Sequence, residues 1–263
     1  MIEPQPLSDA QLSRYSRHLL LPEVDLAGQT RLAYSKALLI GAGGLGSPAA
    51  MYLASSGVGK ITLFDHDEVD LGNLQRQIAF CTKDIGESKA ERLRQTLLEL
   101  NPEIEVEAFC QQAEGDALIR AVTAADVVID ACDNFDTRFA INKACFATGT
   151  PLVSGAAIRL QGQATVFDPR QQGSPCYHCL YREEDILPQD TCRDRGVFAP
   201  LVGIIGSIQA AEALKLLLGL GQPLTGRLLL LDALTMTPRV VNLPKDPDCP
   251  VCAKSSKAQC NKT

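Results

Sequence analysis

The sequence predicts an α/β fold. A Rossmann-like nucleotide-binding sheet with helices on both faces is expected to continue into a mixed or antiparallel C-terminal part, clipped by a four-cysteine zinc site. Three observations lead to this prediction. Apolar segments of strand length alternate with helical patterns, a glycine-rich turn follows one of these segments, and two Cys-x-x-Cys pairs stand far apart in the last third of the chain. Alternating strands and helices are typical of a parallel sheet covered on both faces.

The glycine-rich turn is the most informative segment. An apolar run at 37–40 ends in Gly41-Ala42-Gly43-Gly44-Leu45-Gly46, a helical pattern follows, and a second strand at 61–64 ends on Asp65. Glycines here let the backbone approach a phosphate at the positive end of a helix, and an acid about 20 residues later suits ribose hydroxyl groups. We expect an adenine nucleotide at this turn; the alternative is a tight packing turn.

Composition limits the class of protein. The chain has 263 residues, 46% of them hydrophobic, and a net charge of −6, which indicates a soluble globular protein and argues against nucleic-acid or anionic-membrane partners. The first residues lack the basic segment of a signal peptide, so a cytoplasmic location is expected. Ten cysteines then indicate metal or thiol chemistry in a reducing compartment. The apolar stretch 199–221 carries Gln209, Glu212 and Lys215 and predicts a buried amphipathic helix, not a membrane span.

Polar residues follow the strand that ends on Asp65. The segment 66–77 lies where open α/β sheets bind ligands, so we expect Asn73, Arg76 and Gln77 to reach a nucleotide. Lys89 stands in the first turn of a helix predicted at 88–101. A cation there opposes the helix dipole unless an anion lies nearby, although an ordinary surface lysine is an equally good interpretation.

Hydrophobic periodicity predicts the other elements. Ser8 and Gln11 form a capping-box pattern that opens a helix to about Leu20, and Arg14 and Arg17 within it suit a solvated helix face. Further helices are expected at 114–123, 136–148 and 202–218, and strands at 104–109, 126–134, 151–154, 157–168, 227–232 and 239–243.

Two sets of residues are candidate metal ligands. Asp133 follows a buried strand and could hold Mg²⁺, although an N-cap at Asp133 or Asp136 is the alternative. Near the end of the chain, two Cys-x-x-Cys pairs have the spacing of a four-thiolate zinc site, in which His178 would be a bystander. A redox pair and an iron–sulfur cluster are the alternatives. The pairs are Cys176 with Cys179 and Cys249 with Cys252.

Together, G-A-G-G-L-G, N-L-Q-R-Q, Lys89, the Asp133-Asn134 pair and the cysteine pairs resemble the MoeB/ThiF (HesA) family of ubiquitin-activating-enzyme-like adenylyltransferases. The resemblance covers residues 8–252, and the segments 154–167, 175–180 and 199–210 are most similar to molybdopterin-synthase adenylyltransferases. It implies an enzyme that uses ATP and Mg²⁺ to adenylate the C-terminal glycine of a ubiquitin-like sulfur carrier ending in Gly-Gly, with release of pyrophosphate.

The resemblance also implies partners. The expected carrier is the small subunit of molybdopterin synthase, which is later converted to a thiocarboxylate in molybdenum cofactor biosynthesis; a thiamin-pathway carrier or a shared carrier is the alternative. A separate sulfur donor, either a sulfurtransferase or a cysteine desulfurase, is expected because no rhodanese-like domain is recognised. A homodimer is expected as well, because Arg17 matches an arginine that reaches the ATP site of the other subunit.

Individual roles carry over by position. Asp65 would hold the ribose, Arg76 and Lys89 would stabilise charge at the α-phosphate, and Asp133 would lie at Mg²⁺ and the reacting centre. The four cysteines match the zinc ligands of the family. The complete set of expected nucleotide-binding residues is Gly41, Gly43, Gly44, Gly46, Asp65, Gly72, Asn73, Leu74, Gln75, Arg76, Lys89, Asp133 and Asn134.

The family varies in residue type or in role at the positions of Gly72 and Cys192. Gly72 replaces the small polar residue that the family often has before the Asn-Leu pair. Cys192, among arginines that favour a thiolate, matches a cysteine that links covalently to the carrier in the thiamin branch; a bland loop cysteine is the alternative. Within one E1-like domain we expect a helical arm (1–30), an ATP-binding part (31–155), a carrier-binding part with the zinc site and a crossover loop (156–252), and a disordered tail (253–263).

Two other classes of protein share part of this pattern. The glycine turn alone would suit an NAD-dependent oxidoreductase, but that reading leaves Arg76, Lys89 and the cysteine pairs unexplained. A non-catalytic scaffold for a ubiquitin-like protein would be expected to have a damaged nucleotide site, whereas Asp65, Arg76, Lys89 and Asp133 are all present.

Overall fold

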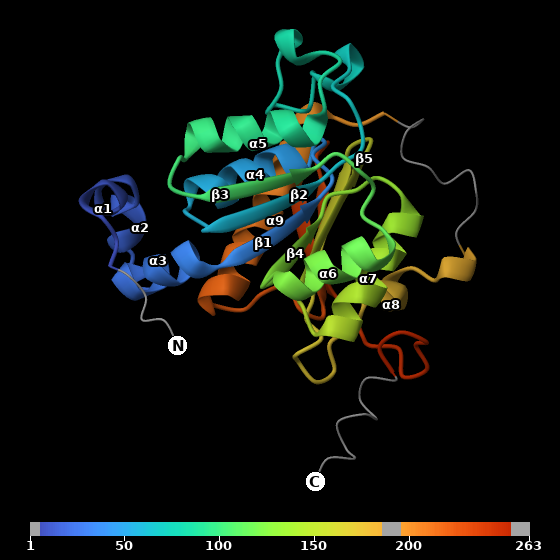
Figure 1. Cartoon of the computed structure of the whole chain (residues 1–263). Coiled ribbons are helices and arrows are strands. Elements are labelled where there is room, and N and C mark those ends of the chain that lie inside the picture. Colours follow the sequence, from blue (N-terminus) through green and yellow to red (C-terminus); the bar gives the residue numbers. More distant parts are fainter. Residues whose placement is uncertain (1–5, 186–195, 254–263) are drawn as a thin grey trace.

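The computed structural model describes residues 6–185 and 196–253, and the strands within them form one sheet (Figure 1). In chain order the strands are β1 (Lys36–Ile40), β2 (Lys60–Phe64), β3 (Glu105–Phe109), β4 (Val127–Asp130), β5 (Leu152–Ile158), β6 (Gln161–Phe167), β7 (Arg227–Asp232) and β8 (Thr237–Asn242). Their spatial order is β3-β2-β1-β4-β5-β6-β7-β8. The pairs from β3 to β5 are parallel and those from β5 to β8 antiparallel, so the predicted change of sheet type is confirmed.

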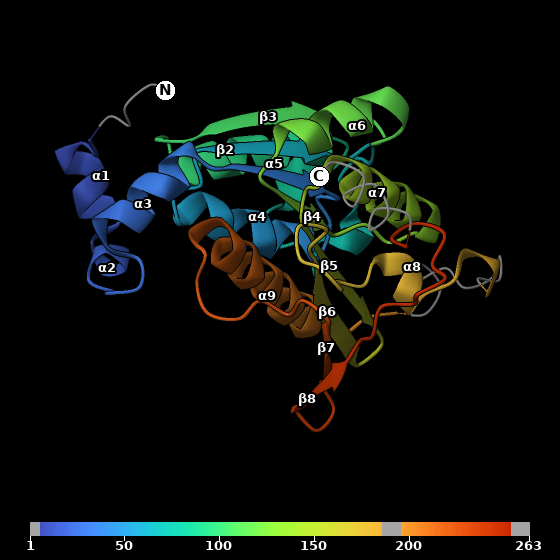
Figure 2. The same cartoon turned by 90° about the horizontal axis from the view of Figure 1, so that it is seen from below.

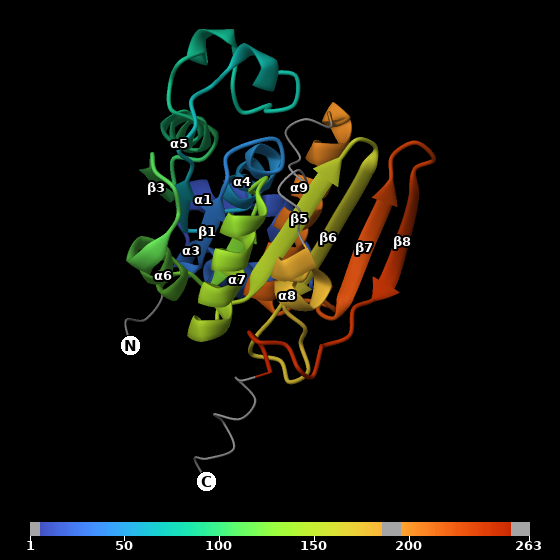
Figure 3. The same ribbon diagram turned by 90° about the vertical axis from the view of Figure 1, so that its right-hand side faces the viewer.

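Helices cover both faces of this sheet (Figures 2 and 3). The α-helices are α1 (Asp9–Arg14), α2 (Ser16–Leu19), α3 (Asp25–Tyr34), α4 (Gly46–Ser55), α5 (Lys89–Leu100), α6 (Gly115–Ala124), α7 (Phe135–Thr148), α8 (Tyr177–Leu180) and α9 (Ala199–Leu218). Short 3-10 helices are η1 (Leu71–Asn73), η2 (Thr82–Asp84) and η3 (Glu183–Asp185). One hydrophobic core lies under α4, α5 and α9, and a second lies under α6 and α7.

The central strands contribute to both cores, which is why they are apolar throughout. In β1, Leu38 and Ile40 pack in the core under α6 and α7, whereas Ala37 and Leu39 pack in the core under α4 and α9. Successive side chains of a strand point to opposite faces, so a strand covered on both sides needs no polar positions.

Two sequence expectations about element boundaries are wrong. The strand expected at 157–168 is the end of one strand and all of another, joined by a turn in which Arg159 has φ +53°. Alternation continues through both arms of this hairpin, so the pattern alone does not reveal the turn. The helix expected from Ser8 to Leu20 is interrupted at Tyr15 (φ −95°, ψ 14°), although the capping box of Ser8 and Gln11 is confirmed.

Helix α9 is long and apolar enough to cross a membrane by length and composition alone. In this fold it packs against α4, β5 and β6, and Leu201, Ile205 and Gln209 are fully buried. Its polar side chains bond internally, since Gln209 Nε2 donates to the Asp130 carbonyl oxygen (2.7 Å) and Glu212 accepts from the Leu224 N–H (2.7 Å). The helix is therefore a core element of the fold.

The N-terminal arm lies at the end of the sheet where β1 begins (Figure 1). Arg14 Nη1 donates to the Leu100 carbonyl oxygen (3.1 Å), and Asn101 Nδ2 donates to the Tyr15 hydroxyl (2.9 Å), so α1 is tied to the C-terminal end of α5. Helix α3 runs to Tyr34, past the boundary expected at residue 30. The boundary expected at 155 falls inside β5, and of the expected tail only Ala253 is described.

Candidate active site

A cleft of about 560 Å³ opens at the carboxyl ends of β1, β2 and β4. The chain runs from β1 to β2 and β3 on one side of the sheet and then crosses to β4 on the other side of β1. Ligands of open α/β sheets bind at such a reversal of strand order. Most of the predicted nucleotide-binding residues line this cleft: Gly41, Gly43, Gly44, Asp65, Asn73, Gln75, Arg76, Lys89, Asp133 and Asn134.

Steric crowding explains the glycine-rich turn. Gly41 has φ +96°, which L side chains rarely adopt, and a Cβ there would lie 2.7 Å from the Ala131 carbonyl oxygen. A Cβ at Gly46 would overlap the Gly41 carbonyl oxygen. Gly46 does not line the cleft; it lets α4 begin directly under the turn. The turn and the N-terminus of α4 therefore approach each other as a phosphate-binding loop requires.

Asp65 is held at the cleft by backbone hydrogen bonds. Its carboxylate accepts from the Ala42 N–H (2.7 Å) and from the Asp67 N–H (2.8 Å), so it links the glycine turn to the segment after β2. Burial raises the pKa of Asp65. The two backbone hydrogen bonds and the nearby positive charge of Lys89 oppose this rise.

Lys89 is a buried cation with a partner that sequence reasoning missed. Its side chain is 5% exposed, and its Nζ lies 2.9 Å from Asp67 Oδ2. A surface lysine is therefore the wrong interpretation. Lys89 is the first residue of α5, where a cation is unfavourable next to the positive end of the helix dipole. The carboxylate of Asp67 offsets this repulsion.

The segment around η1 contributes Asn73 and Arg76. Arg76 donates from Nη1 to the Gly72 carbonyl oxygen (3.1 Å) and from Nη2 to Asn73 Oδ1 (3.4 Å). Gln77 is only 4% exposed and donates from Nε2 to the same Asn73 oxygen (2.9 Å). Gln77 and Asn73 therefore lie side by side in the wall of the cleft.

The far wall is the loop between β4 and α7. Asn134, not Asp133 or Asp136, is the N-cap of α7, because its Oδ1 accepts from the Thr137 N–H (2.9 Å). Asp133 is exposed and lines the cleft.

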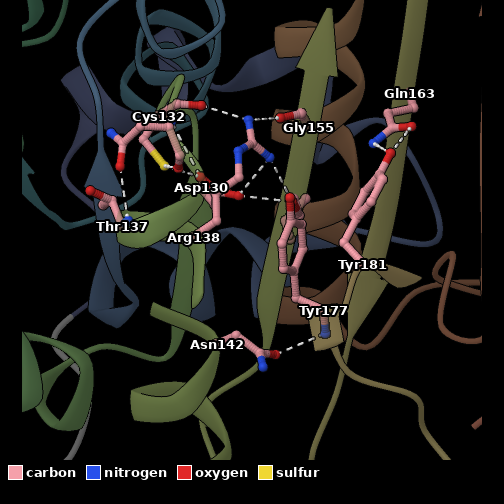
Figure 4. A network of polar contacts seen from close by, with 12 residues as sticks. Asp130, Cys132, Thr137, Arg138, Asn142, Gly155, Gln163, Tyr177 and Tyr181 are labelled. Atoms are coloured by element: carbon pink, nitrogen blue, oxygen red, sulfur yellow. Dashed lines mark hydrogen bonds and ion pairs between the residues drawn. The ribbon is translucent and has the colours of Figure 1, made fainter. Parts of the chain in front are cut away.

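Arg138 organises this wall, and sequence reasoning missed it (Figure 4). The buried guanidinium donates to Asp130 Oδ2 (3.0 Å), the Cys132 carbonyl oxygen (2.5 Å) and the Gly155 carbonyl oxygen (2.9 Å). It therefore fixes the peptide that leads into Asp133. An arginine on the predicted helix 136–148 gave no sequence signal, since its partners are distant in the chain.

Several predicted residues lie elsewhere. Gly72 and Leu74 belong to the same segment as Asn73 but do not line the cleft. Arg17 is exposed on α2, near the C-terminal end of α5, whereas the cleft is at the N-terminal end. A helix of 12 residues spans about 18 Å, so Arg17 is remote from the cleft of its own chain. Cys192 lies outside the described residues.

The four cysteines of the two Cys-x-x-Cys pairs form one cluster, with all sulfurs within 4.8 Å of one another. The Sγ atoms of Cys176 and Cys249 are 3.5 Å apart, as are those of Cys179 and Cys252. Disulfides would need about 2.05 Å. Four sulfurs around Zn²⁺, each at about 2.3 Å in a tetrahedron, would be roughly 3.8 Å apart. The donor set and its spacing therefore fit zinc.

The clustered thiols differ in their pKa values. A hydrogen bond with Cys176 lowers the pKa of Cys179 to about 5, while burial raises the pKa of Cys252 to about 12. The shared hydrogen bond and burial raise the pKa of Cys176 further. Thiolates this close repel one another, so a divalent cation is needed for all four to ionise. His178 Nδ1 is 3.9 Å from Cys249 Sγ and lies beside the cluster.

Comparisons with known proteins agree with this geometry. The sequence profile of the ThiF family matches residues 15–251. The molybdopterin-synthase adenylyltransferase of Escherichia coli K12 is 44% identical over 250 residues, which cover 94% of this chain and 99% of that protein. The sulfur carrier protein ThiS adenylyltransferase of the same organism is 45% identical over 251 residues, which cover 95% and 98%.

Solved structures share the fold. The crystal structure of Escherichia coli MccB with ATP has a TM-score of 0.77 and 25% sequence identity, and the match covers 91% of this chain and 73% of that chain. The profile match spans the glycine turn, the cleft and three of the four clustered cysteines, since it ends one residue before Cys252. The chain therefore belongs to the ThiF family, and it is an adenylyltransferase.

Proposed function

We propose that this enzyme adenylates the C-terminal glycine of a ubiquitin-like sulfur-carrier protein and releases pyrophosphate, before a sulfur donor converts the product to a thiocarboxylate. The observation that carries the proposal is the convergence of Asp65, Asn73, Arg76, Lys89 and Asp133 on one cleft at the glycine turn. The names of the relatives, molybdopterin-synthase and ThiS adenylyltransferases, support the carrier as the second substrate.

The cleft suits the charge problem of this reaction. A carboxylate that attacks the α-phosphate of ATP brings two anions together, so fixed cations are needed where charge develops. Arg76 faces the cleft from one side, and Lys89, which has three donors and uses one on Asp67, can direct the others to phosphate oxygens. Positioning and charge compensation suffice for the displacement, so the step requires no covalent residue of the enzyme.

Mg²⁺ and a second subunit complete the proposed site. Asp133 would hold Mg²⁺ together with the phosphates of ATP, the arrangement that magnesium prefers. Arg17 would enter the cleft of the partner subunit in a homodimer, which its distance from its own cleft supports. The four cysteines would hold a structural Zn²⁺, because a closed tetrahedral shell of thiolates leaves no position for substrate.

The proposed carrier is the small subunit of molybdopterin synthase, acting in the cytoplasm, with a separate protein as sulfur donor. The MOCS3 protein of Aedes aegypti is named for both an adenylyltransferase and a sulfurtransferase activity. The match covers 94% of this chain but only 56% of that protein. The thiamin-pathway carrier is the second candidate, because the ThiS adenylyltransferase is as similar to this chain as the molybdopterin-synthase enzyme.

ATP–pyrophosphate exchange with purified carriers of each pathway tests the proposal. Exchange with the molybdopterin-pathway carrier alone is the expected result. Exchange with the thiamin-pathway carrier alone would correct the pathway and keep the chemistry. No exchange with either carrier, from protein that binds ATP, would refute sulfur-carrier adenylation.

A further inference from the structure

The orientation of the Asn73 amide is determined by its neighbours. Arg76 Nη2 lies 3.4 Å from one atom at the end of the Asn73 side chain. A guanidinium can only donate hydrogen bonds, so the atom that faces it is the oxygen Oδ1. The nitrogen Nδ2 must then point the other way. Among the described residues Nδ2 has no acceptor, and Asn73 lines the cleft.

The same logic fixes Gln77. The atom of Gln77 that lies 2.9 Å from Asn73 Oδ1 must be a donor, so it is Nε2. Gln77 Oε1 is consequently turned into the protein, where it is buried and has no hydrogen-bond partner in the described chain. A buried unpaired acceptor destabilises a fold. Stability alone therefore does not account for a glutamine in this position.

We propose that Gln77 is a positioning residue for the nucleotide cleft: it holds Asn73 with its amide nitrogen toward the cleft, where Nδ2 donates to an anionic phosphate oxygen. The inference rests on the proposed function in one respect, that the ligand of the cleft is a nucleotide. Gln77 lines the cleft beside Asn73, and with its Nε2 engaged on Asn73 Oδ1 its proposed contribution is made through Asn73.

The physical basis is the near symmetry of a carboxamide. The two ends of an amide have almost the same shape, so a freely rotating Asn73 would present its oxygen to the phosphates as readily as its nitrogen. An oxygen facing a phosphate repels it. Arg76 at 3.4 Å gives only a weak bias, whereas the 2.9 Å hydrogen bond from Gln77 gives a strong one. The hydrogen bond from Gln77 therefore fixes the Asn73 amide with its donor nitrogen Nδ2 toward the cleft.

A double-mutant cycle on MgATP affinity tests this role, with calorimetric titration of the full chain in the absence of carrier. Gln77→Met keeps the shape and removes the donor, and we expect ATP to bind about three- to tenfold more weakly. Asn73→Ala should weaken binding by about 10- to 100-fold, since a hydrogen bond to a charged group is lost. The double variant should bind as weakly as Asn73→Ala alone, because Gln77 acts only through Asn73.

A matched control separates positioning from stability. Gln29 is also fully buried and bonded through its amide, to the Ser56 carbonyl oxygen, but it lies in α3, outside the cleft. Gln29→Met should lower the melting temperature and leave ATP affinity unchanged. If Gln77→Met weakens ATP binding by the same factor with and without Asn73, or does not weaken it at all, the positioning role is wrong.

A further variant keeps the fold and tests the direction of the amide. Asn73→Asp retains an oxygen toward Arg76 and Gln77 but places a second, negative oxygen in the cleft, so ATP should bind at least as weakly as to Asn73→Ala. Affinity close to that of the parent would overturn the assigned orientation. A non-additive cycle without pyrophosphate exchange would leave the role of Gln77 intact and refute the carrier assignment alone.

Discussion

The guanidinium carbon of Arg138 lies 5.9 Å from the centroid of the Tyr177 ring. Tyr177 follows Cys176 directly, and Arg138 holds the carbonyl group before Asp133. The backbone N–H of Tyr177 also donates to Asn142 Oδ1 (2.9 Å), so two residues of α7 contact the tyrosine that lies between the first two cysteines (Figure 4). The cysteine cluster and the far wall of the cleft therefore share one helix as their support.

Arg138→Met should strongly destabilise the protein, by about 3–5 kcal/mol, because it leaves the buried carboxylate of Asp130 without its cation. Urea denaturation measures the loss. Combining the change with Asp130→Asn should recover part of it, since no unpaired charge is then buried. Equal losses in the single and double variants would show that the ion pair is not the source of the effect.

Arg76→Ala and Asp133→Ala should each lower adenylation by about 10²–10³-fold while the protein stays folded, because each removes a group proposed to face developing charge or Mg²⁺. Pyrophosphate exchange measures the rate. Arg94→Ala is a matched control, since Arg94 pairs with Glu91 on α5. Near-normal exchange in either cleft variant would remove that residue from the proposed site.

Cys176→Ser should reduce bound zinc and lower the melting temperature, because a structural metal contributes folding free energy. Zinc is counted by atomic emission and unfolding is followed by circular dichroism. Cys81→Ser is the control: Cys81 is exposed and contacts Asp84, outside the cluster. A variant that lacks zinc and melts with the parent would contradict a structural role.

As the pH is lowered, nucleotide binding should begin to weaken at a higher pH than it would if Asp65 had the pKa of an ordinary aspartate. Burial raises the pKa of Asp65, so the ionised carboxylate disfavours folding above that pKa, and this cost disappears as pH falls through it. The proton that relieves the cost also removes the proposed acceptor of ribose hydroxyl groups. Adenosine, which lacks phosphates, isolates this effect in titrations from pH 7 downward. Asp65→Asn should lose the acid dependence, and an unchanged profile would refute the assignment.

Arg17 can be tested by mixing subunits. If Arg17 serves the partner cleft, Arg17→Ala and Asp133→Ala proteins are each inactive, but their heterodimer contains one intact cleft. Random re-association of equal amounts should restore about one quarter of the parent activity. Mixtures that stay inactive, although mass spectrometry detects heterodimers, would place Arg17 outside the reaction.

Local chemistry made part of the site predictable from sequence. Glycine is required at positions 41 and 46 because a Cβ at either position would collide with a backbone carbonyl oxygen. Asp65 follows at the spacing that a strand–helix–strand unit imposes. Arg138 could not be recognised in this way, because its partners Asp130 and Gly155 are brought to it by the sheet.

The burial of Lys89 and Gln77 likewise depends on tertiary packing. Neither residue type is usually buried, and the polar segment 66–77 gives no periodic signal from which burial could be read. The partner of Lys89, Asp67, lies 22 positions away. Sequence patterns therefore identified the residues of this wall but not their arrangement.

The cysteine cluster also bears on the order of events during folding. Cys176 and Cys249 are 73 positions apart, and α9, β7 and β8 lie between them. Closing a loop of this length in a disordered chain costs about 4 kcal/mol in chain entropy. Assembly of the antiparallel half of the sheet supplies this closure, so we expect the four sulfurs to meet after it has formed. Metal capture would be a late step, and until it occurs the thiols remain open to oxidation, so the metal supplied during synthesis would set the yield of native protein.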